Sequence, residues 1–274
     1  MNNATLPDGC SQPGSYLLDN AAKQAPARFG ALSAMFDAST IRHLEDRGIG
    51  PGWHCLEVGG GGGSVARWLS TCVGEAGRVL VTDIDTRFLR DLSLSNLEVL
   101  RHDIVRDPLP ENAFDLVHAR LVLVHVPEKE KVLEKLIAAL KPGGWLVDEE
   151  FDSLSVPPDP AVSPGEVVLP THVAMGRLMA DRGFERRWGR LLCKRFRENR
   201  LVEVGAEGRM FMAQCGSPAA ALLRANFEQL HEGLIAAHYI TAQQFEDDLA
   251  RLEYSDFMMP SSILWTAWGR RPPV

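Results

Sequence analysis

Five consecutive glycines at positions 59–63 constrain the fold of this chain more than any other feature of its sequence. An apolar run at 55–58 precedes them and an amphipathic stretch at 64–69 follows, which predicts a strand, a glycine turn and a helix. A turn without Cβ atoms lets a nucleotide-like ligand lie directly against the backbone, beside the N-terminus of the helix. The segment therefore predicts an α/β protein with a ligand site at this turn.

Short apolar runs continue to alternate with amphipathic stretches along the chain. Strands are predicted at 54–58, 78–83, 97–100, 114–118 and 145–151, with helices between most of them, and further strands near 201–213 and at 262–269. This alternation is typical of a parallel sheet that is covered by helices. We therefore expect an α/β fold with a doubly wound, mostly parallel seven-stranded sheet.

Helical segments outside this alternation predict a cap and a lid. Apolar residues at helical spacing between Tyr16 and Arg47 predict two helices, which end at a Gly-Pro-Gly turn, and we expect an N-terminal helical cap at 1–50. The main domain is expected at 51–274. After its fifth and sixth strands come helical lid insertions, near 165–200 (helices at 172–182 and 187–198) and at 217–252 (two helices).

The spacing of the glycines separates two classes of ligand. A dinucleotide fingerprint requires a third glycine at position 64, where the chain has Ser64. Gly59, Gly61 and Gly63 instead form a G-x-G-x-G pattern, and Glu57 lies two residues before the first of them. This arrangement resembles the first motif of class I methyltransferases. The resemblance implies that Glu57 orients the methionine end of an S-adenosylmethionine cofactor, directly or through water.

Acidic residues end the next two predicted strands. Asp83 follows the glycines by about twenty residues, where a carboxylate can accept hydrogen bonds from both ribose hydroxyls, and Ile84 would pack on the adenine face. Asp103 ends the third strand and is suited to accept from the adenine amino group, while Ile104 covers the ring. The alternatives are a helix-capping acid at the first position and a surface turn at the second.

Two later segments are similar to the same family. Residues 114–120, which end in Ala119 and Arg120, resemble the family's fourth strand, whose end lies beside the sulfonium, and residues 140–147 resemble its turn into the fifth strand. The resemblance covers residues 53–151 in order and spacing, and more broadly it is to bacterial small-molecule methyltransferases of the ubiquinone/menaquinone-biosynthesis type. It implies a Rossmann-like methyltransferase fold, S-adenosylmethionine as cofactor, and in-line transfer of a methyl group to oxygen, nitrogen or carbon of a small acceptor, such as a secondary metabolite.

Methyl transfer depends mainly on aligning nucleophile, methyl and sulfur, although a hydroxyl acceptor gains from a general base. His125, just beyond the fourth strand, is the candidate catalytic residue; the alternative is a packed histidine bonded to backbone. Tyr16 lies where the cap would fold over the cofactor. Its phenol is a candidate partner for the methionine carboxylate, with core packing as the alternative.

The acidic residues Glu149, Glu150 and Asp152 follow the fifth predicted strand and admit three interpretations. They could face the acceptor, bind a cation or lie in solvent. Metal-dependent members of the family carry acids after both the fourth and the fifth strands, but the fourth strand here ends without a carboxylate. We therefore expect no metal.

Charge and composition favour a small-molecule partner. A formal net charge of -7 gives no broad basic surface for phosphate backbones, so nucleic acid is not expected. The first residues lack a signal-peptide pattern and no apolar run is long enough to cross a bilayer, so we expect a cytoplasmic protein that does not enter membranes.

Basic residues gather between positions 177 and 200, against the acidic character of the whole chain. They could recognise an anionic substrate, such as a carboxylate, a phosphate or a carrier-bound acyl group, through bidentate arginine contacts. The alternative is a solvated helix face, because apolar residues form an opposite stripe.

Two other classes of function stay open. One is a dinucleotide-dependent oxidoreductase on a similar sheet, against which Ser64 weighs. The other is a cyclase or scaffold that binds S-adenosylmethionine without methylating. The sequence also leaves open whether the chain forms a homodimer.

Overall fold

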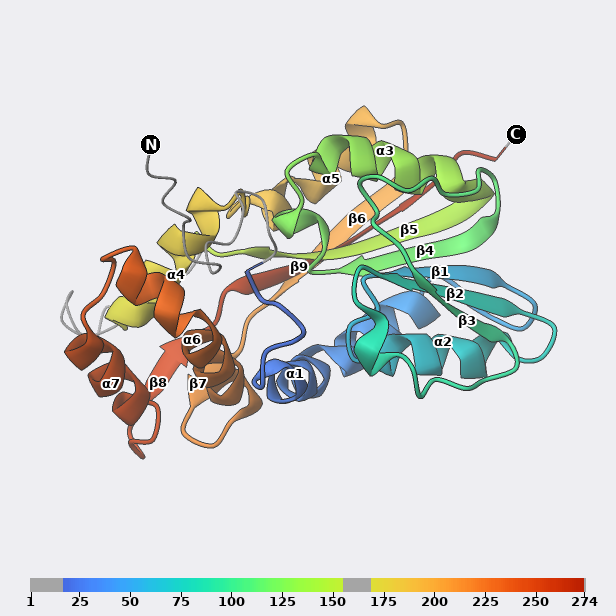
Figure 1. Cartoon of the computed structure of the whole chain (residues 1–274). Coiled ribbons are helices and arrows are strands. Elements are labelled where there is room, and N and C mark those ends of the chain that lie inside the picture. Colours follow the sequence, from blue (N-terminus) through green and yellow to red (C-terminus); the bar gives the residue numbers. More distant parts are fainter. Residues whose placement is uncertain (1–16, 155–168, 274) are drawn as a thin grey trace, which may run out of the picture.

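A seven-stranded sheet forms the centre of the computed structural model, which describes residues 17–154 and 169–273 (Figure 1). The strand order is β3-β2-β1-β4-β5-β9-β6. Strands β1 to β5 pair in parallel, and β9 runs antiparallel to both β5 and β6. The expected mostly parallel sheet is thus confirmed. Its strands are β1 (His54–Val58), β2 (Arg78–Asp83), β3 (Leu97–Arg101), β4 (Phe114–Arg120), β5 (Leu140–Asp152), β6 (Val202–Arg209) and β9 (Ile263–Arg270).

The order of the strands fixes where a ligand site can form. The chain enters the sheet at β1, runs outward to β3 and returns to the other side of β1 as β4. Neighbouring connections therefore leave in opposite directions from the carboxyl ends of β1 and β4, and the backbones separate there. In open α/β sheets this point is where ligands bind.

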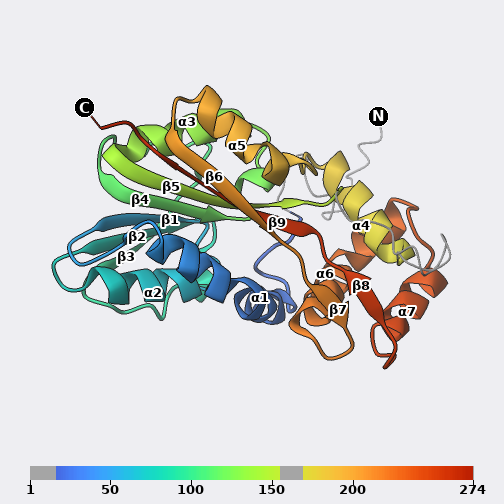
Figure 2. The same ribbon diagram turned by 180° about the vertical axis from the view of Figure 1, so that it is seen from behind.

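Helices cover both faces of the sheet (Figures 1 and 2). On one face lie α1 (Ala25–Glu45) and α2 (Ser64–Val73), whose Leu44 and Leu69 share a buried cluster with β1. On the other face lie α3 (Lys129–Ala139) and α5 (Trp188–Glu198), whose apolar residues share a second cluster with β4 and β5. The apolar stripe of α5 thus serves the core, as its sequence pattern predicts.

A separate group of elements, here called the lid, lies beyond one end of the sheet (Figure 1). Phe36 of α1 belongs to the same buried cluster as Phe227 and Phe245 of the lid, so α1 joins the lid to the sheet. The lid consists of α4 (Pro170–Asp181), α6 (Pro218–Ala236), α7 (Ala242–Arg251) and the paired strands β7 (Met212–Gln214) and β8 (Met258–Pro260).

Several elements differ from expectation. Residues 25–45 form one helix, not two, because Pro26 lies in the first turn, where its missing N–H is not needed, and no later residue breaks the helix. Only the short 3-10 helix η1 (Thr86–Phe88) stands between β2 and β3, and no helix joins β3 to β4. The strand predicted near 201–213 divides into β6 and β7, and β7 pairs with β8 outside the sheet.

The segment expected as one lid insertion near 165–200 divides between the lid and the sheet. Helix α4 packs against α6 and α7 in the lid, whereas α5 packs on β5 and β9. A Cβ on Gly189 of α5 would lie 2.3 Å from the carbonyl oxygen of Glu150, so α5 lies directly on the strand backbone. None of the described helices is long and apolar enough to cross a membrane.

Candidate active site

A cavity of about 940 Å³ begins at the carboxyl ends of β1, β2 and β4 and extends under the lid. This volume lies in the range of cofactor and small-molecule sites in proteins. Glu57, Gly63 and Ala119 do not line it, and Tyr16 lies outside the described residues. The other predicted site residues do line it: Gly59, Gly61, Asp83, Ile84, Asp103, Ile104, Arg120 and His125.

The glycine turn meets the cavity at Gly59 and Gly61, where φ is +68° and +52°. A Cβ at Gly59 would come within 2.4 Å of the Val122 side chain, and one at Gly61 within 2.8 Å of the Phe29 ring. Both positions therefore require glycine for space and for conformation. Gly63 instead precedes α2 and leaves room for a neighbouring leucine side chain, so its role is packing.

The Asp83 carboxylate holds the turn in place. It is nearly buried, and its two oxygens accept hydrogen bonds from the backbone N–H groups of Gly61 and Asp85, each at 2.9 Å. Burial raises the pKa of the Asp83 carboxyl, while these backbone donors act against the rise. Each carboxylate oxygen has a second lone pair with which to accept from a ligand. Asp85 itself caps η1 by accepting from the Arg87 N–H.

Two apolar side chains border the same part of the cavity. Ile84 is 54% exposed and lines the wall beside Asp83, so it offers an apolar surface for a flat ring to cover. Ile104 lines the wall beyond β3 and is largely buried. Asp103 precedes it, and one of its oxygens accepts from the Val105 N–H at 2.9 Å. These positions fit the adenine end of the predicted cofactor.

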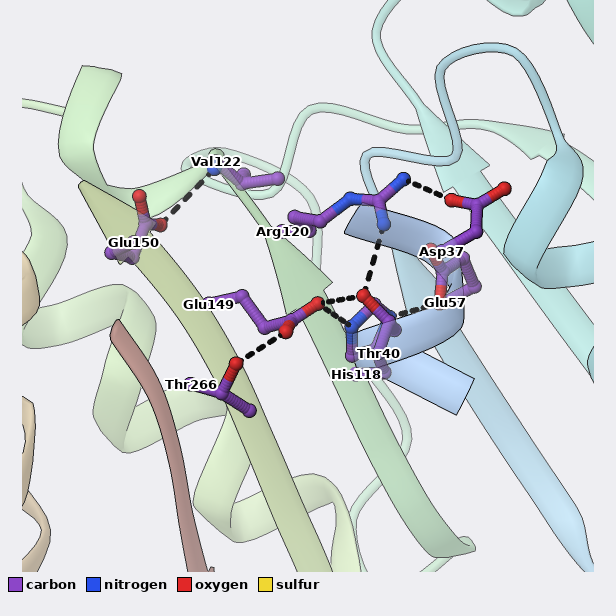
Figure 3. Close-up of polar contacts among 9 residues, drawn as sticks. All are labelled: Asp37, Thr40, Glu57, His118, Arg120, Val122, Glu149, Glu150 and Thr266. Carbon is purple, nitrogen blue, oxygen red and sulfur yellow. Dashed lines mark hydrogen bonds and ion pairs between the residues drawn. The ribbon is translucent and has the colours of Figure 1, made fainter. Parts of the chain in front are cut away.

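A buried polar network under α1 crosses β1, β4, β5 and β9 (Figure 3). His118 lies at its centre, with Nδ1 2.6 Å from Glu57 Oε2 and Nε2 3.2 Å from Glu149 Oε2. Burial acts to lower the pKa of His118, but the Glu57 and Glu149 carboxylates outweigh it and raise that pKa to about 9. His118 is therefore a charged link between two acids, and Glu57 is engaged with it rather than facing the cavity.

The network continues from Glu149 to α1 (Figure 3). Thr266 donates to Glu149 Oε1 at 2.6 Å, and Thr40 of α1 donates to Oε2. Arg120 donates to the Thr40 hydroxyl at 3.0 Å and pairs with Asp37 of α1 at 2.9 Å. Arg120 thus fastens α1 to the end of β4 while it lines the cavity.

The acids of β5 are buried, so the interpretation that places them in solvent is wrong. Glu150 accepts hydrogen bonds from the backbone N–H groups of Leu123 and Val124 in η2 (Leu123–His125). It also accepts from the N–H of Val122 before them (Figure 3). Asp152 binds Arg190 through two hydrogen bonds of 2.6 and 2.7 Å. Asp148 shows no hydrogen bond to its carboxylate among the described residues, and burial raises its pKa to about 8 against the opposing charge of His118.

His125 lies in the cavity wall between the glycine turn and the lid. Its ring meets the Phe184 ring edge-on, with centroids 5.0 Å apart. Burial lowers the pKa of His125 to about 3, and the positive charges of Arg28 and Lys129 act in the same direction. The imidazole is therefore neutral near pH 7.

Comparison with known proteins gives matches over the first half of the chain. A family model described as a methyltransferase domain matches residues 56–148. The ubiquinone/menaquinone biosynthesis C-methyltransferase UbiE of Pseudomonas savastanoi pv. phaseolicola is 35% identical over 116 residues, covering 39% of this chain and 45% of that protein. UbiE of Laribacter hongkongensis is 35% identical over 123 residues, covering 43% of this chain and 50% of that protein. The chain thus spans about half the length of these curated relatives.

Solved structures resemble the fold over most of the chain. Phosphoethanolamine N-methyltransferase 2 of Haemonchus contortus, solved with phosphomonomethylethanolamine and S-adenosylhomocysteine, gives a TM-score of 0.60 at 17% identity over 98% of this chain and 62% of its own. The YcgJ protein of Bacillus subtilis gives a TM-score of 0.57 at 13% identity, over 87% of this chain and 100% of its own. The strand order, the glycine turn and the domain matched over residues 56–148 support a class I S-adenosylmethionine-dependent methyltransferase, and the solved structures share its Rossmann-like fold.

Proposed function

We propose that the chain transfers a methyl group from S-adenosylmethionine to a small-molecule acceptor held between the sheet and the lid. The observation that carries the proposal is one continuous cavity, which reaches from Gly59 and Asp83 at the strand ends to Met179 in the lid. Donor and acceptor can therefore meet inside the protein. Placing both reactants in one water-poor space is the main requirement of an in-line displacement.

The residues at the strand ends fit the cofactor. The cofactor would lie against the backbone of Gly59 and Gly61, which line the cavity. Asp83 would accept from the ribose hydroxyls, and Ile84 would cover the adenine. Arg120 borders the cavity beyond them, toward the methionine end. Glu57 acts indirectly in this account, because its ion pair with His118 joins β1 to β4 beneath the turn.

The chain's own part in the reaction is alignment, exclusion of water and removal of a proton. S-adenosylmethionine supplies a methyl group on a sulfonium, which leaves as a neutral thioether. The apolar lid walls exclude water around the acceptor. If the acceptor is a hydroxyl, His125 in the cavity wall is the candidate to take its proton as the methyl group is transferred.

The test of this function is the chemistry of the products. The purified chain is incubated with S-adenosylmethionine and a library of small acceptors, and S-adenosylhomocysteine and methylated product are both measured by mass spectrometry. We expect the two in equal amounts with at least one acceptor. A converted acceptor without S-adenosylhomocysteine would contradict methyl transfer and identify a cyclase or another cofactor-retaining enzyme.

A further inference from the structure

The basic segment between 177 and 200 divides into two groups in the structure. One group lies outside the cavity, and most of its cations have a partner on the protein. Arg177 stacks on the Tyr239 ring at 4.2 Å, and others in this group form ion pairs: Arg187 with Glu185, Arg190 with Asp152, Lys194 with Glu198, and Arg195 with Glu130 and Glu198. Arg182 and Arg186 form the other group and line the cavity.

No acidic side chain of the described residues pairs with Arg182 or Arg186. Arg182 follows the last residue of α4, and its Nη1 is buried without a hydrogen-bond acceptor in the part of the chain that the structure describes. Arg186 donates from Nε to the Ser153 hydroxyl at 3.2 Å and from Nη2 to the Ser153 carbonyl at 3.4 Å, and its guanidinium packs over Gly176 of α4. A buried N–H without an acceptor is costly, so the geometry favours an acceptor supplied by a ligand.

The two arginines border the part of the cavity where methyl transfer would occur. They flank a turn that is fixed to η2, since the Glu185 N–H donates to the Val124 carbonyl at 3.1 Å and Phe184 contacts the His125 ring. His172 of α4 lines the same space; burial, then the charge of Arg186, lowers its pKa to about 4. This part of the cavity therefore combines positive charge with neutral imidazoles.

The walls around the arginines are apolar. Met175 and Met179 of α4 face the cavity together with Leu222 of α6, Met259 of β8 and Phe151 of β5. Methionine side chains adapt to irregular apolar shapes. A ligand that fills this space must therefore carry an apolar body as well as a group that arginine binds.

Building on the proposed methyl transfer, we propose that the acceptor is an amphipathic organic anion. Its carboxylate or phosphate oxygens bind Arg182 and Arg186, and its apolar body lies against Met179, Leu222 and Met259. The planar guanidinium is suited to oxyanions of both kinds, because it offers two parallel N–H donors. Binding at this end aligns the acceptor toward the cofactor end past His125.

Two fluorescent probes that differ mainly in one charged group test this assignment. 1-Anilinonaphthalene-8-sulfonate is an apolar anion, and N-phenyl-1-naphthylamine has the same ring system without the sulfonate. Each is titrated into the full chain, alone and with saturating S-adenosylhomocysteine, which keeps the probes out of the donor end. We expect the anion to bind at least tenfold more tightly than the neutral probe, and only its affinity to fall with added salt.

Substitutions then assign the effect to the two arginines. Arg182→Gln and Arg186→Gln should each weaken the anionic probe about tenfold to a hundredfold and leave the neutral probe unchanged, because only the charged hydrogen bonds are lost. Arg177→Gln is the matched control, since Arg177 lies on α4 outside the cavity. If a glutamine variant does not fold, Arg182→Lys and Arg186→Lys replace it. These variants keep the positive charge and should retain part of the affinity for the anionic probe.

Displacement of the anionic probe identifies the oxyanion. Decanoate and decyl phosphate should compete more strongly than decanol, and the stronger of the two tells whether the site prefers carboxylate or phosphate. Equal competition by decanol, or equal losses in Arg177→Gln and the cavity variants, would overturn the proposal. A loss of S-adenosylmethionine affinity in Arg182→Gln or Arg186→Gln would also overturn it, because the arginines would then belong to the cofactor.

These readouts separate the two levels of the account. If S-adenosylmethionine and S-adenosylhomocysteine do not bind, the proposed function fails, yet the probes titrated alone still report on the arginines. If S-adenosylmethionine and S-adenosylhomocysteine bind but the anionic probe binds no more tightly than the neutral one, the proposed methyl transfer stands and the proposed acceptor class is wrong.

Discussion

At the scale of single residues, the site depends on side chains whose surroundings fix their charge and direction. The place of Asp83 and Ile84 in the cavity wall could be predicted from the sequence, because a strand-end acid after a glycine turn has a restricted place in this fold. His118 and Asp148 could not. His118 stands within an apolar run, and only strand pairing shows that it lies between two carboxylates. Asp148 lacks even a polar neighbour in its own strand pairs, Ala119 and Ala267.

Replacing Asp83, the proposed ribose-binding acid, should weaken binding of the cofactor. In Asp83→Ala we expect S-adenosylmethionine affinity to fall by about 1–3 kcal/mol, because charged hydrogen bonds to the ribose are lost. Isothermal titration measures this change. Asp85→Ala is the control, since Asp85 caps η1 on the same loop and should keep nearly the same affinity. Equal losses in the two variants would show that the loop as a whole, and not the Asp83 carboxylate, determines binding.

Replacing His125 should separate chemistry from binding. In His125→Ala, turnover of a hydroxyl acceptor should fall by about 10²–10⁴-fold, the usual contribution of a general base, with cofactor affinity preserved. Because its pKa is lowered to about 3, His125 is neutral in the free enzyme above about pH 5. The rate should therefore show no loss from its protonation between pH 5 and 8. An unchanged rate in His125→Ala would show that His125 takes no part in the chemistry and only packs in the cavity wall.

At the scale of elements, the positions of the strands followed from the sequence, but their helical cover did not. Apolar runs fix where β1, β2 and β4 lie within a few residues. Periodicity does not reveal whether a helix packs in the lid or on the sheet. The helices α4 and α5 were therefore expected in one lid insertion, although α4 packs in the lid and α5 on the sheet. The contact between α1 and the glycine turn was likewise hidden, because it depends on Phe29 crossing to Gly61.

That contact makes the glycine turn a test of how α1 and the sheet fit together. Gly61→Ala should lower the free energy of unfolding by about 1–3 kcal/mol, since φ is +52° and the new Cβ would meet Phe29 at 2.8 Å. Urea unfolding measures it. In a Phe29→Ala background the clash is removed, so Gly61→Ala should lower the free energy of unfolding only by the part that comes from the positive φ.

Gly48→Ala supplies the control for that share. Its φ is +78° and a Cβ there would have nothing within 4 Å, so it measures the backbone cost alone. If Gly61→Ala costs no more than Gly48→Ala and Phe29→Ala changes nothing, α1 does not press on the turn.

At the scale of the whole molecule, buried charge couples stability to pH. The polar network joins four strands to α1, and the acids of β5 lie beside it. The sequence showed these acids as a strand-end cluster, and their burial could not be foreseen because β5 extends to Asp152 and pairs with β9. The division of labour between sheet and lid was hidden for a similar reason, since the lid's packing joins segments far apart in the chain.

Asp148 should make the protein less stable as pH rises. Its pKa is about 8 in the folded chain and about 4 when unfolded, so the folded state binds more protons between these values and stability falls as pH increases through them. Asp148→Asn removes this dependence. Its gain in melting temperature over the parent chain should grow from about pH 4 to pH 8, with each kcal/mol worth roughly 2–4 °C.

Scanning calorimetry across this range checks the prediction, with the exposed Asp91→Asn as control. A gain for Asp148→Asn that stays constant with pH would mean that the carboxyl is not held neutral. A gain of the same size in Asp91→Asn would assign the effect to net charge.

The central claim, that the cavity at the glycine turn takes S-adenosylmethionine, is tested most directly by isothermal titration of the purified chain. S-adenosylmethionine, S-adenosylhomocysteine and NADH are titrated in parallel, after any cofactor carried through purification has been removed. We predict saturable binding of the first two at one site per chain, with dissociation constants in the micromolar range, and no binding of NADH. Binding of NADH alone would contradict the account and make the glycine turn a dinucleotide site.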